Sequence, residues 1–261
     1  MLGRWILLDN QRANKTALTA EAKREEAMLH FETTQWTLVV RAAERESVEA
    51  QQALGQLCEK YWRPLFQYAR RRTRDDATAS DSVQAFIARL IEKDFLKVAD
   101  SERGKFRSFL IVSFKRFLYQ EQISKNAKKR GGGQPNLSLD QREDDDRKME
   151  PADTLTADQE FQRQWARTVL QLVMEQLEND YQKQGKLKQF QQLKPFIARA
   201  EGQNYQAVAD QLQMTPSAAR MAASRLRDHF RQLLRQEITQ TVSSQQHVDE
   251  EIRDLFLAFQ T

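Results

Sequence analysis

The apolar residues of the chain recur at three- and four-residue steps, which is the spacing of amphipathic helices. In the front block, residues 31–125, this pattern predicts four helices joined into one helical domain. Pro64 lies inside the second helix, and we expect it to kink or break that helix because proline has no backbone N–H. The four apolar stripes are Trp36, Val39, Val40 and Ala43; Leu54, Leu57, Tyr61, Leu65 and Tyr68; Val83, Phe86, Ile87, Leu90 and Ile91; and Phe106, Phe109, Leu110 and Phe117.

A second helical block covers residues 158–240. Its pattern predicts one amphipathic helix from Phe161 to Val173 and another from Leu187 to Ile197, followed by a close pair over 205–212 and 216–234. A last amphipathic helix falls within 241–261. No segment alternates with the two-residue period of a strand, so we predict an all-α fold of two small domains, of which the second is a helix-turn-helix.

Residues 126–157 separate the two blocks and have a different composition. Basic residues and three glycines are followed by the acidic run 140–150, and few apolar residues are available for burial. Such a segment cannot offset its ordering entropy, so we interpret it as a flexible linker. Residues 1–30 are polar after Leu8 and predict a poorly ordered extension, and Met28 offers an alternative translation start.

Composition narrows the class of protein. Only 8 glycines and 5 prolines in 261 residues favour helix, and a net charge of +4 means that nucleic-acid binding must be argued from local patches. A single cysteine, Cys58, excludes an intramolecular disulfide, and three dispersed histidines predict no zinc site. The first residues lack the apolar core of a signal peptide, and no stretch is long enough to span a bilayer. We therefore expect a cytoplasmic protein without a metal, cofactor or membrane partner.

The strongest motif is the pair of helices over 205–227. Thr215 followed by Pro216 predicts an N-cap and a first helical residue, and small alanines permit the close crossing of a helix-turn-helix. Gln213 stands in the turn where glycine is usual. An ordinary helix pair with a solvated arginine stripe would give the same pattern. If the pair binds DNA, the start of the second helix would contact base edges in the major groove, and residues further along would contact phosphates. The candidate DNA-binding residues are Ser217, Ala218, Arg220 and Met221 at the start, then Ser224, Arg227 and Arg231.

Aromatic and basic residues alternate over 104–122. Cations beside flat rings suit a single strand of nucleic acid, because phosphates need charge and unpaired bases need stacking surfaces. On the residues alone, an amphipathic core helix with solvated cations is the favoured explanation of the same segment. The basic run 70–74 has two equally good explanations: it can contact phosphates, or its cations can stabilise the end of a helix.

Six segments occur in an order that resembles extracytoplasmic-function (ECF) sigma factors of the sigma-70 family, especially the long variants of planctomycete-like bacteria. These segments are 57–71, 79–90, 104–110, 129–133, 161–166 and the helix-turn-helix. The resemblance implies two partners, core RNA polymerase and promoter DNA, and allows for an anti-sigma factor as a third. The front domain would bind the polymerase clamp helices and open the minus-ten element, while the second would bind the flap and read the minus-thirty-five element.

The resemblance also assigns residues to these surfaces. Ser217, Ala218, Arg220 and Met221 would fall in the recognition helix. The polymerase-binding helix would carry Asp81, Gln84 and Phe86. The strand-opening surface would carry Arg107, Lys115, Arg116, Tyr119 and Gln120. Two positions depart from the family pattern: Ser82 replaces a commoner leucine, and Ala222 replaces a frequent basic residue.

We therefore predict an alternative sigma factor, not an enzyme. A stand-alone helix-turn-helix regulator with an N-terminal sensing or dimerisation domain is the alternative. A helical hydrolase or nuclease fits poorly, because we find no histidine cluster, no metal-ligand spacing and no glycine-rich phosphate loop. No small-molecule substrate is expected.

Overall fold

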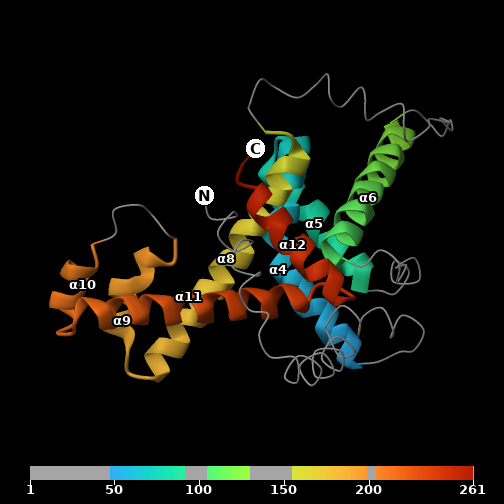
Figure 1. The fold of residues 1–261 in the computed structure, drawn as a ribbon. Coiled ribbons are helices and arrows are strands. Elements are labelled where there is room, and N and C mark those ends of the chain that lie inside the picture. Colours follow the sequence, from blue (N-terminus) through green and yellow to red (C-terminus); the bar gives the residue numbers. More distant parts are fainter. Residues whose placement is uncertain (1–47, 92–104, 130–154, 199–203, 261) are drawn as a thin grey trace. The chain divides into compact units, whose positions relative to one another are not determined.

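A computed structural model describes residues 48–91, 105–129, 155–198 and 204–260, and every element within these ranges is a helix (Figure 1). The predicted all-α class is confirmed. The described residues divide into an N-terminal unit, up to Trp165, and a C-terminal unit from Ala166 to Gln260. The helix predicted around Trp36 and the extension 1–30 lie outside the described residues, as does most of the predicted linker.

The N-terminal unit contains α4 (Val48–Thr73), α5 (Asp76–Ile91), α6 (Phe106–Lys129) and the start of α8 (Ala157–Lys183). Its core is aromatic: the ring centres of Tyr61 and Phe106 lie 5.1 Å apart, and those of Phe86 and Phe114 lie 4.9 Å apart. Such pairs contribute about 0.5–1.5 kcal/mol each beyond the burial of their area. The apolar stripes of the sequence therefore locate this core.

Helix α4 continues through Pro64, so of the two expected effects of this proline, a kink or a break, the break does not occur. The helix runs for 26 residues, and Pro64 is buried together with Leu65. Packing of a long amphipathic face outweighs the lost backbone hydrogen bond, because most helical stability in proteins comes from tertiary burial. Helix α6 also continues to Lys129, a few residues past the predicted start of the linker.

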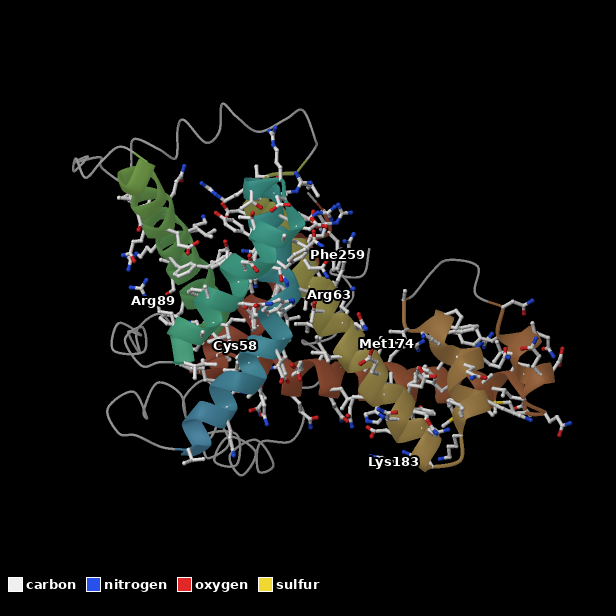
Figure 2. All side chains as sticks on the ribbon, turned by 180° about the vertical axis from the view of Figure 1, so that it is seen from behind. Cys58, Arg63, Arg89, Met174, Lys183 and Phe259 are labelled. Carbon is white, nitrogen blue, oxygen red and sulfur yellow. The ribbon has the colours of Figure 1, made fainter. Side chains whose placement is uncertain are left out.

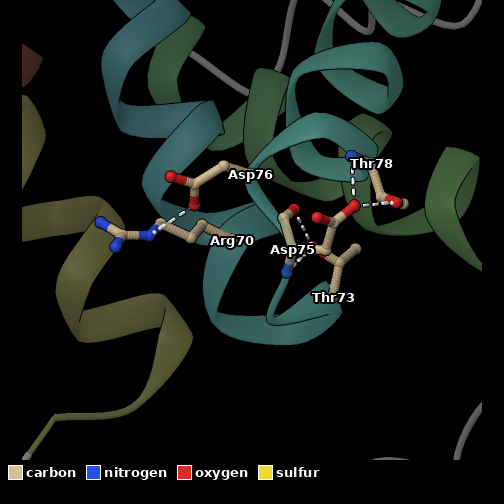
Figure 3. A network of polar contacts seen from close by, with 5 residues as sticks. All are labelled: Arg70, Thr73, Asp75, Asp76 and Thr78. Carbon is tan, nitrogen blue, oxygen red and sulfur yellow. Dashed lines mark hydrogen bonds and ion pairs between the residues drawn. The ribbon is translucent and has the colours of Figure 1, made fainter.

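The corner between α4 and α5 is fixed by local polar contacts (Figure 3). Arg74 adopts a left-handed backbone with φ of 56°. The Asp75 carboxylate caps α5 by accepting hydrogen bonds from the backbone N–H of Thr78, at 2.8 Å, and from its hydroxyl. Arg70 Nε lies 2.8 Å from Asp76 Oδ1. These contacts set the direction in which α5 leaves α4.

The C-terminal unit contains the rest of α8, where Figure 2 labels Met174 and Lys183, then α9 (Leu187–Leu193) and the 3-10 helix η4 (Lys194–Phe196). After these come α10 (Tyr205–Gln211), α11 (Pro216–Thr239) and α12 (Gln245–Leu257). The unit begins within α8, whereas the sequence predicts a boundary at 158. The reason is that Phe161 and Trp165, at the start of α8, are buried in the N-terminal unit.

Helix α12 occupies the last predicted amphipathic segment. Its apolar stripe of Val248, Ile252 and Leu255 is buried, and Arg235 of α11 donates to Asp249 Oδ1 at 2.6 Å. In the parts of the chain that the structure describes, none of the helices combines the length and apolarity needed to cross a membrane.

Candidate nucleic-acid interface

Helix α11 has the N-cap that the sequence predicts, and α10 has an N-cap that the sequence analysis did not name. The Thr215 hydroxyl accepts a hydrogen bond from Ala218 N at 3.2 Å, and Pro216 is the first helical residue of α11. Asn204 caps α10 by accepting from Gln206 N at 3.0 Å and from Ala207 N at 3.2 Å. Both helix starts are therefore determined by local sequence.

The turn between α10 and α11 is a Schellman motif. Met214 N donates to Ala209 O at 2.9 Å, and Gln213 N donates to Asp210 O at 3.4 Å. Gln213 has a φ of 52°, the left-handed conformation that glycine adopts without steric cost. The turn thus has the geometry typical of a glycine at this position, although the chain has glutamine.

The buried face of α11 consists largely of alanine near the turn. Ala219 and Ala223 are fully buried, and Ala222 nearly so. On α10 the facing residues Val208 and Ala209 are also buried. Small side chains let the two helices cross closely, which leaves the other face of α11 open.

The open face of α11 carries the residues predicted for base contact. Ser217, Arg220, Met221 and Ser224 are exposed, with Met221 at 61%, while Ala218 is half-buried. They occupy the first turns of α11, the part of a recognition helix that reaches base edges in a major groove. The structure therefore brings together four of the predicted contact residues on one accessible surface.

A contact that the sequence did not predict supports this surface. The Arg220 guanidinium lies 5.6 Å from the ring centre of Tyr205, the first residue of α10. The Tyr205 ring in turn packs against Phe196 of η4, with 4.9 Å between ring centres. An aromatic residue at a helix start gave no signal, because its partners are distant in sequence.

Arg227 corrects the predicted phosphate contacts. It is only 6% exposed, and its Nη1 donates to the Phe196 carbonyl at 3.4 Å. Arg227 shares a helical face with Arg220, but η4 contacts that face further along α11. Arg231 is half-buried and binds Asp228 Oδ1 at 2.7 Å. The prediction of an outward Arg227 is therefore wrong, and Arg231 is already ion-paired.

A polar cavity of about 390 Å³ lies on another side of α11. It is lined by Lys186, Arg225 and His229 among others, and His229 Nε2 lies 3.2 Å from Asp180 Oδ2. Burial raises the pKa of Tyr181 in the same wall, while nearby Arg225 opposes that shift. The cations of this cavity were not among the predicted site residues.

The predicted strand-opening residues on α6 fall into two groups. Arg116 and Gln120 are exposed, and Tyr119 is half-buried. Arg107 is only 6% exposed and so does not lie on an open surface, whereas Lys115 is half-buried and is ion-paired with Asp158 at 2.8 Å. Burial of Arg107 corrects the expectation that it flanks an accessible face.

The predicted polymerase-binding residues of α5 also differ from one another. Asp81 and Gln84 are exposed, whereas Phe86 is fully buried and packs on Phe114 and Phe117. Phe86 therefore does not lie on the exposed side of α5 and instead packs in the core. Ser82, where the family more often has leucine, is buried too.

The described residues contain no group of three or more histidine, cysteine, aspartate or glutamate side chains placed to hold a metal ion. The C-terminal unit contains a capped helix-turn-helix with an exposed arginine. The N-terminal unit contains an aromatic core formed by α4, α5 and α6.

Comparison with known families agrees with these features. A family model for ECF sigma factors matches residues 46–219, which is most of the chain and includes α4 through the start of α11. No curated protein and no solved structure matches the chain. ECF sigma factors are transcription factors and not enzymes, and they bind core RNA polymerase and promoter DNA. The chain therefore belongs to the ECF sigma factor family and is an alternative sigma factor that directs transcription initiation.

Proposed function

We propose that the C-terminal unit reads the minus-thirty-five promoter element as duplex DNA through the start of α11. The observation that carries this proposal is the exposed row of Ser217, Arg220, Met221 and Ser224, which follows directly on a capped, glycine-like turn. Arginine is the residue most suited to a guanine edge in the major groove, and serine hydroxyls can contact either bases or phosphates.

The N-terminal unit binds the polymerase clamp helices through the exposed side of α5, where Asp81 and Gln84 lie. Arg116, Gln120 and Tyr119 on α6 contact the minus-ten element once it is open. The C-terminal unit also holds the polymerase flap, and the protein acts in the cytoplasm, where ECF sigma factors are often regulated by anti-sigma factors. The family match supports this division of roles, because it extends over both units.

The experiment that tests the reading of duplex DNA compares Arg220→Ala with Arg253→Ala. Both variants remove one exposed arginine of the C-terminal unit, but Arg253 lies on α12. If Arg220 reads a guanine, its loss lowers discrimination at one base pair by about 1–3 kcal/mol. Binding of the holoenzyme to a library of promoter variants measures this. Equal sequence preference in the two variants would overturn the assignment of α11.

A stand-alone regulator is the less favoured function, because the match to ECF sigma factors includes the N-terminal unit. Transcription with purified core polymerase separates the two: a repressor or activator cannot start transcription without a sigma factor.

A further inference from the structure

Three cations of the N-terminal unit are bound by residues of the segment 155–165, which leads into α8 and forms its first turns. The Arg107 guanidinium lies 4.1 Å from the ring centre of Trp165. Lys115 Nζ lies 2.8 Å from Asp158 Oδ1 and 2.9 Å from Oδ2. Arg71 donates to the Leu155 carbonyl at 2.6 Å and lies 3.9 Å from Glu160 Oε2. We call residues 155–165 the α8 start.

The α8 start is itself firmly structured. Thr156 and Gln159 form a reciprocal capping box: Gln159 N donates to the Thr156 hydroxyl at 3.1 Å, and Thr156 N donates to Gln159 Oε1 at 2.7 Å. Phe161 and Trp165 are buried in the N-terminal unit. Asp158 and Glu160 also lie in the first turn, where negative charge favours the helix dipole.

The groups that the α8 start offers to these cations resemble those of single-stranded DNA, because both consist of anionic oxygens and a flat aromatic face. Carboxylate oxygens on Lys115 and Arg71 stand where phosphate oxygens would bind, and the Trp165 indole lies against Arg107 as a base face would. Arg107 and Lys115 are also the two strand-opening candidates that the α8 start contacts, whereas Arg116 and Gln120 are exposed.

We propose that the charged side chains of the α8 start cover part of the strand-binding face of the free factor, and that single-stranded promoter DNA displaces these carboxylates from Lys115 and Arg71 while Phe161 and Trp165 stay buried. This inference rests on the proposed strand-opening role of α6. The Lys115 and Asp158 side chains are 37% and 52% exposed, so their ion pair is screened by water and is open to exchange with a phosphate. The cover thus limits contact between the free factor and single-stranded DNA until polymerase presents an opened promoter.

The test uses the full chain carrying Asp158→Asn and Glu160→Gln together, which removes the two charges and keeps the side-chain shapes. Its matched control is Glu175→Gln with Glu178→Gln, on the C-terminal half of the same helix. The probe is a fluorescent 20-nucleotide single strand of mixed sequence, and its anisotropy at low salt reports affinity. We expect the first variant to bind about three- to tenfold more tightly than the control, since two phosphate-competing carboxylates are lost. Equal affinity in both variants would overturn the cover.

A third variant identifies the surface that the probe uses. Adding Lys115→Ala to the Asp158→Asn, Glu160→Gln chain should remove the gain, because the uncovered ammonium is what binds the strand. A gain that persists would show binding elsewhere and would contradict the proposal.

Promoter-specific transcription by the wild-type holoenzyme is measured in parallel. If the wild-type chain initiates correctly but the Asp158→Asn, Glu160→Gln variant gains no affinity for the single strand, only the proposed cover is rejected. Absence of initiation by the wild type rejects the proposed function instead.

Discussion

The guanidinium of Arg220 lies 5.6 Å from the ring centre of Tyr205, so the first helix of the helix-turn-helix orients the main candidate for base reading on the second. Tyr205 is held by Phe196, whose carbonyl also accepts a hydrogen bond from Arg227. The short 3-10 helix η4 thus supports both arginines, Arg220 through the tilted ring contact between Phe196 and Tyr205 and Arg227 through its backbone carbonyl. A side chain whose direction is fixed before binding loses less conformational entropy when it meets DNA.

Tyr205→Ala should therefore weaken promoter binding by the holoenzyme, whereas Tyr205→Phe should not. Both variants lose the hydroxyl, but only alanine removes the ring beside Arg220. An exposed cation–π contact of this kind corresponds to about 0.5–1 kcal/mol, or a loss of roughly two- to fivefold in affinity. Competition binding on promoter duplex measures the effect. Equal losses in the two variants would show that the ring does not orient Arg220.

Gln213→Gly should stabilise the C-terminal unit. Gln213 has a φ of 52°, where a side chain crowds the following carbonyl, and glycine avoids that cost at the expense of chain entropy. The net gain should be up to about 1 kcal/mol in the free energy of unfolding, measured by urea denaturation. As the control, Gln211→Gly changes the last residue of α10 and should lower stability instead. A destabilised Gln213→Gly chain would contradict the Schellman turn.

The corner at Asp75 predicts a loss of stability in acid. Hydrogen bonds from the Thr78 hydroxyl and backbone N–H lower the pKa of the Asp75 carboxyl in the folded state. A group whose pKa is depressed by folding contributes stability above its unfolded pKa, and that contribution is lost as pH falls below about 4. Asp75→Asn keeps an N-cap side chain but cannot titrate, so its stability should fall less steeply in this range. Urea titrations from pH 6 to pH 3 compare the slopes, and identical slopes would remove Asp75 as a contributor.

Cys58 should react very slowly with thiol reagents in the folded protein. Figure 2 labels it on α4, where its side chain is 2% exposed, and burial raises the pKa of its thiol to about 12. The thiolate is the reactive form, so labelling requires that the N-terminal unit open. The labelling rate should rise with urea in parallel with unfolding followed by circular dichroism. Fast labelling in native buffer would mean that α4 is less well packed than the structure shows.

Asp81→Arg should weaken binding to core polymerase while the fold is retained. Asp81 is exposed on α5, and reversing its charge should cost on the order of 1 kcal/mol or more, about fivefold in affinity. Glu59→Arg makes the same charge change on an exposed position of α4. Pull-down of core enzyme by both chains, with matched melting curves, gives the comparison. Similar recovery of polymerase would exclude Asp81 from the interface.

Hydrophobic spacing was sufficient to predict the helices and most of the core, because burial follows the period of each helix. The local sequence also located the start of α11, since the Thr215 cap and Pro216 act within one turn of chain. The same spacing could not show that Arg227 is buried. Arg220 and Arg227 share one face of α11, but η4 covers only the second, and no local pattern encodes that contact.

The candidate sites on α5 and α6 show the same limit. Family position assigned Phe86 and Arg107 to binding surfaces, but Phe86 fills the aromatic core and Arg107 lies against Trp165. Both depend on partners far away in sequence. The cap of α11, which local sequence determines, was predicted correctly, whereas the burial of Arg107 and Arg227, which depends on tertiary contacts, was not.

The central claim is tested most directly by mixing the purified chain with core RNA polymerase and genomic DNA and sequencing the 5′ ends of the transcripts. We predict starts that share a minus-ten and a minus-thirty-five element, and whose preference for the minus-thirty-five element is weakened by Arg220→Ala but kept with Arg253→Ala. Transcript starts that do not depend on the added chain would contradict the account.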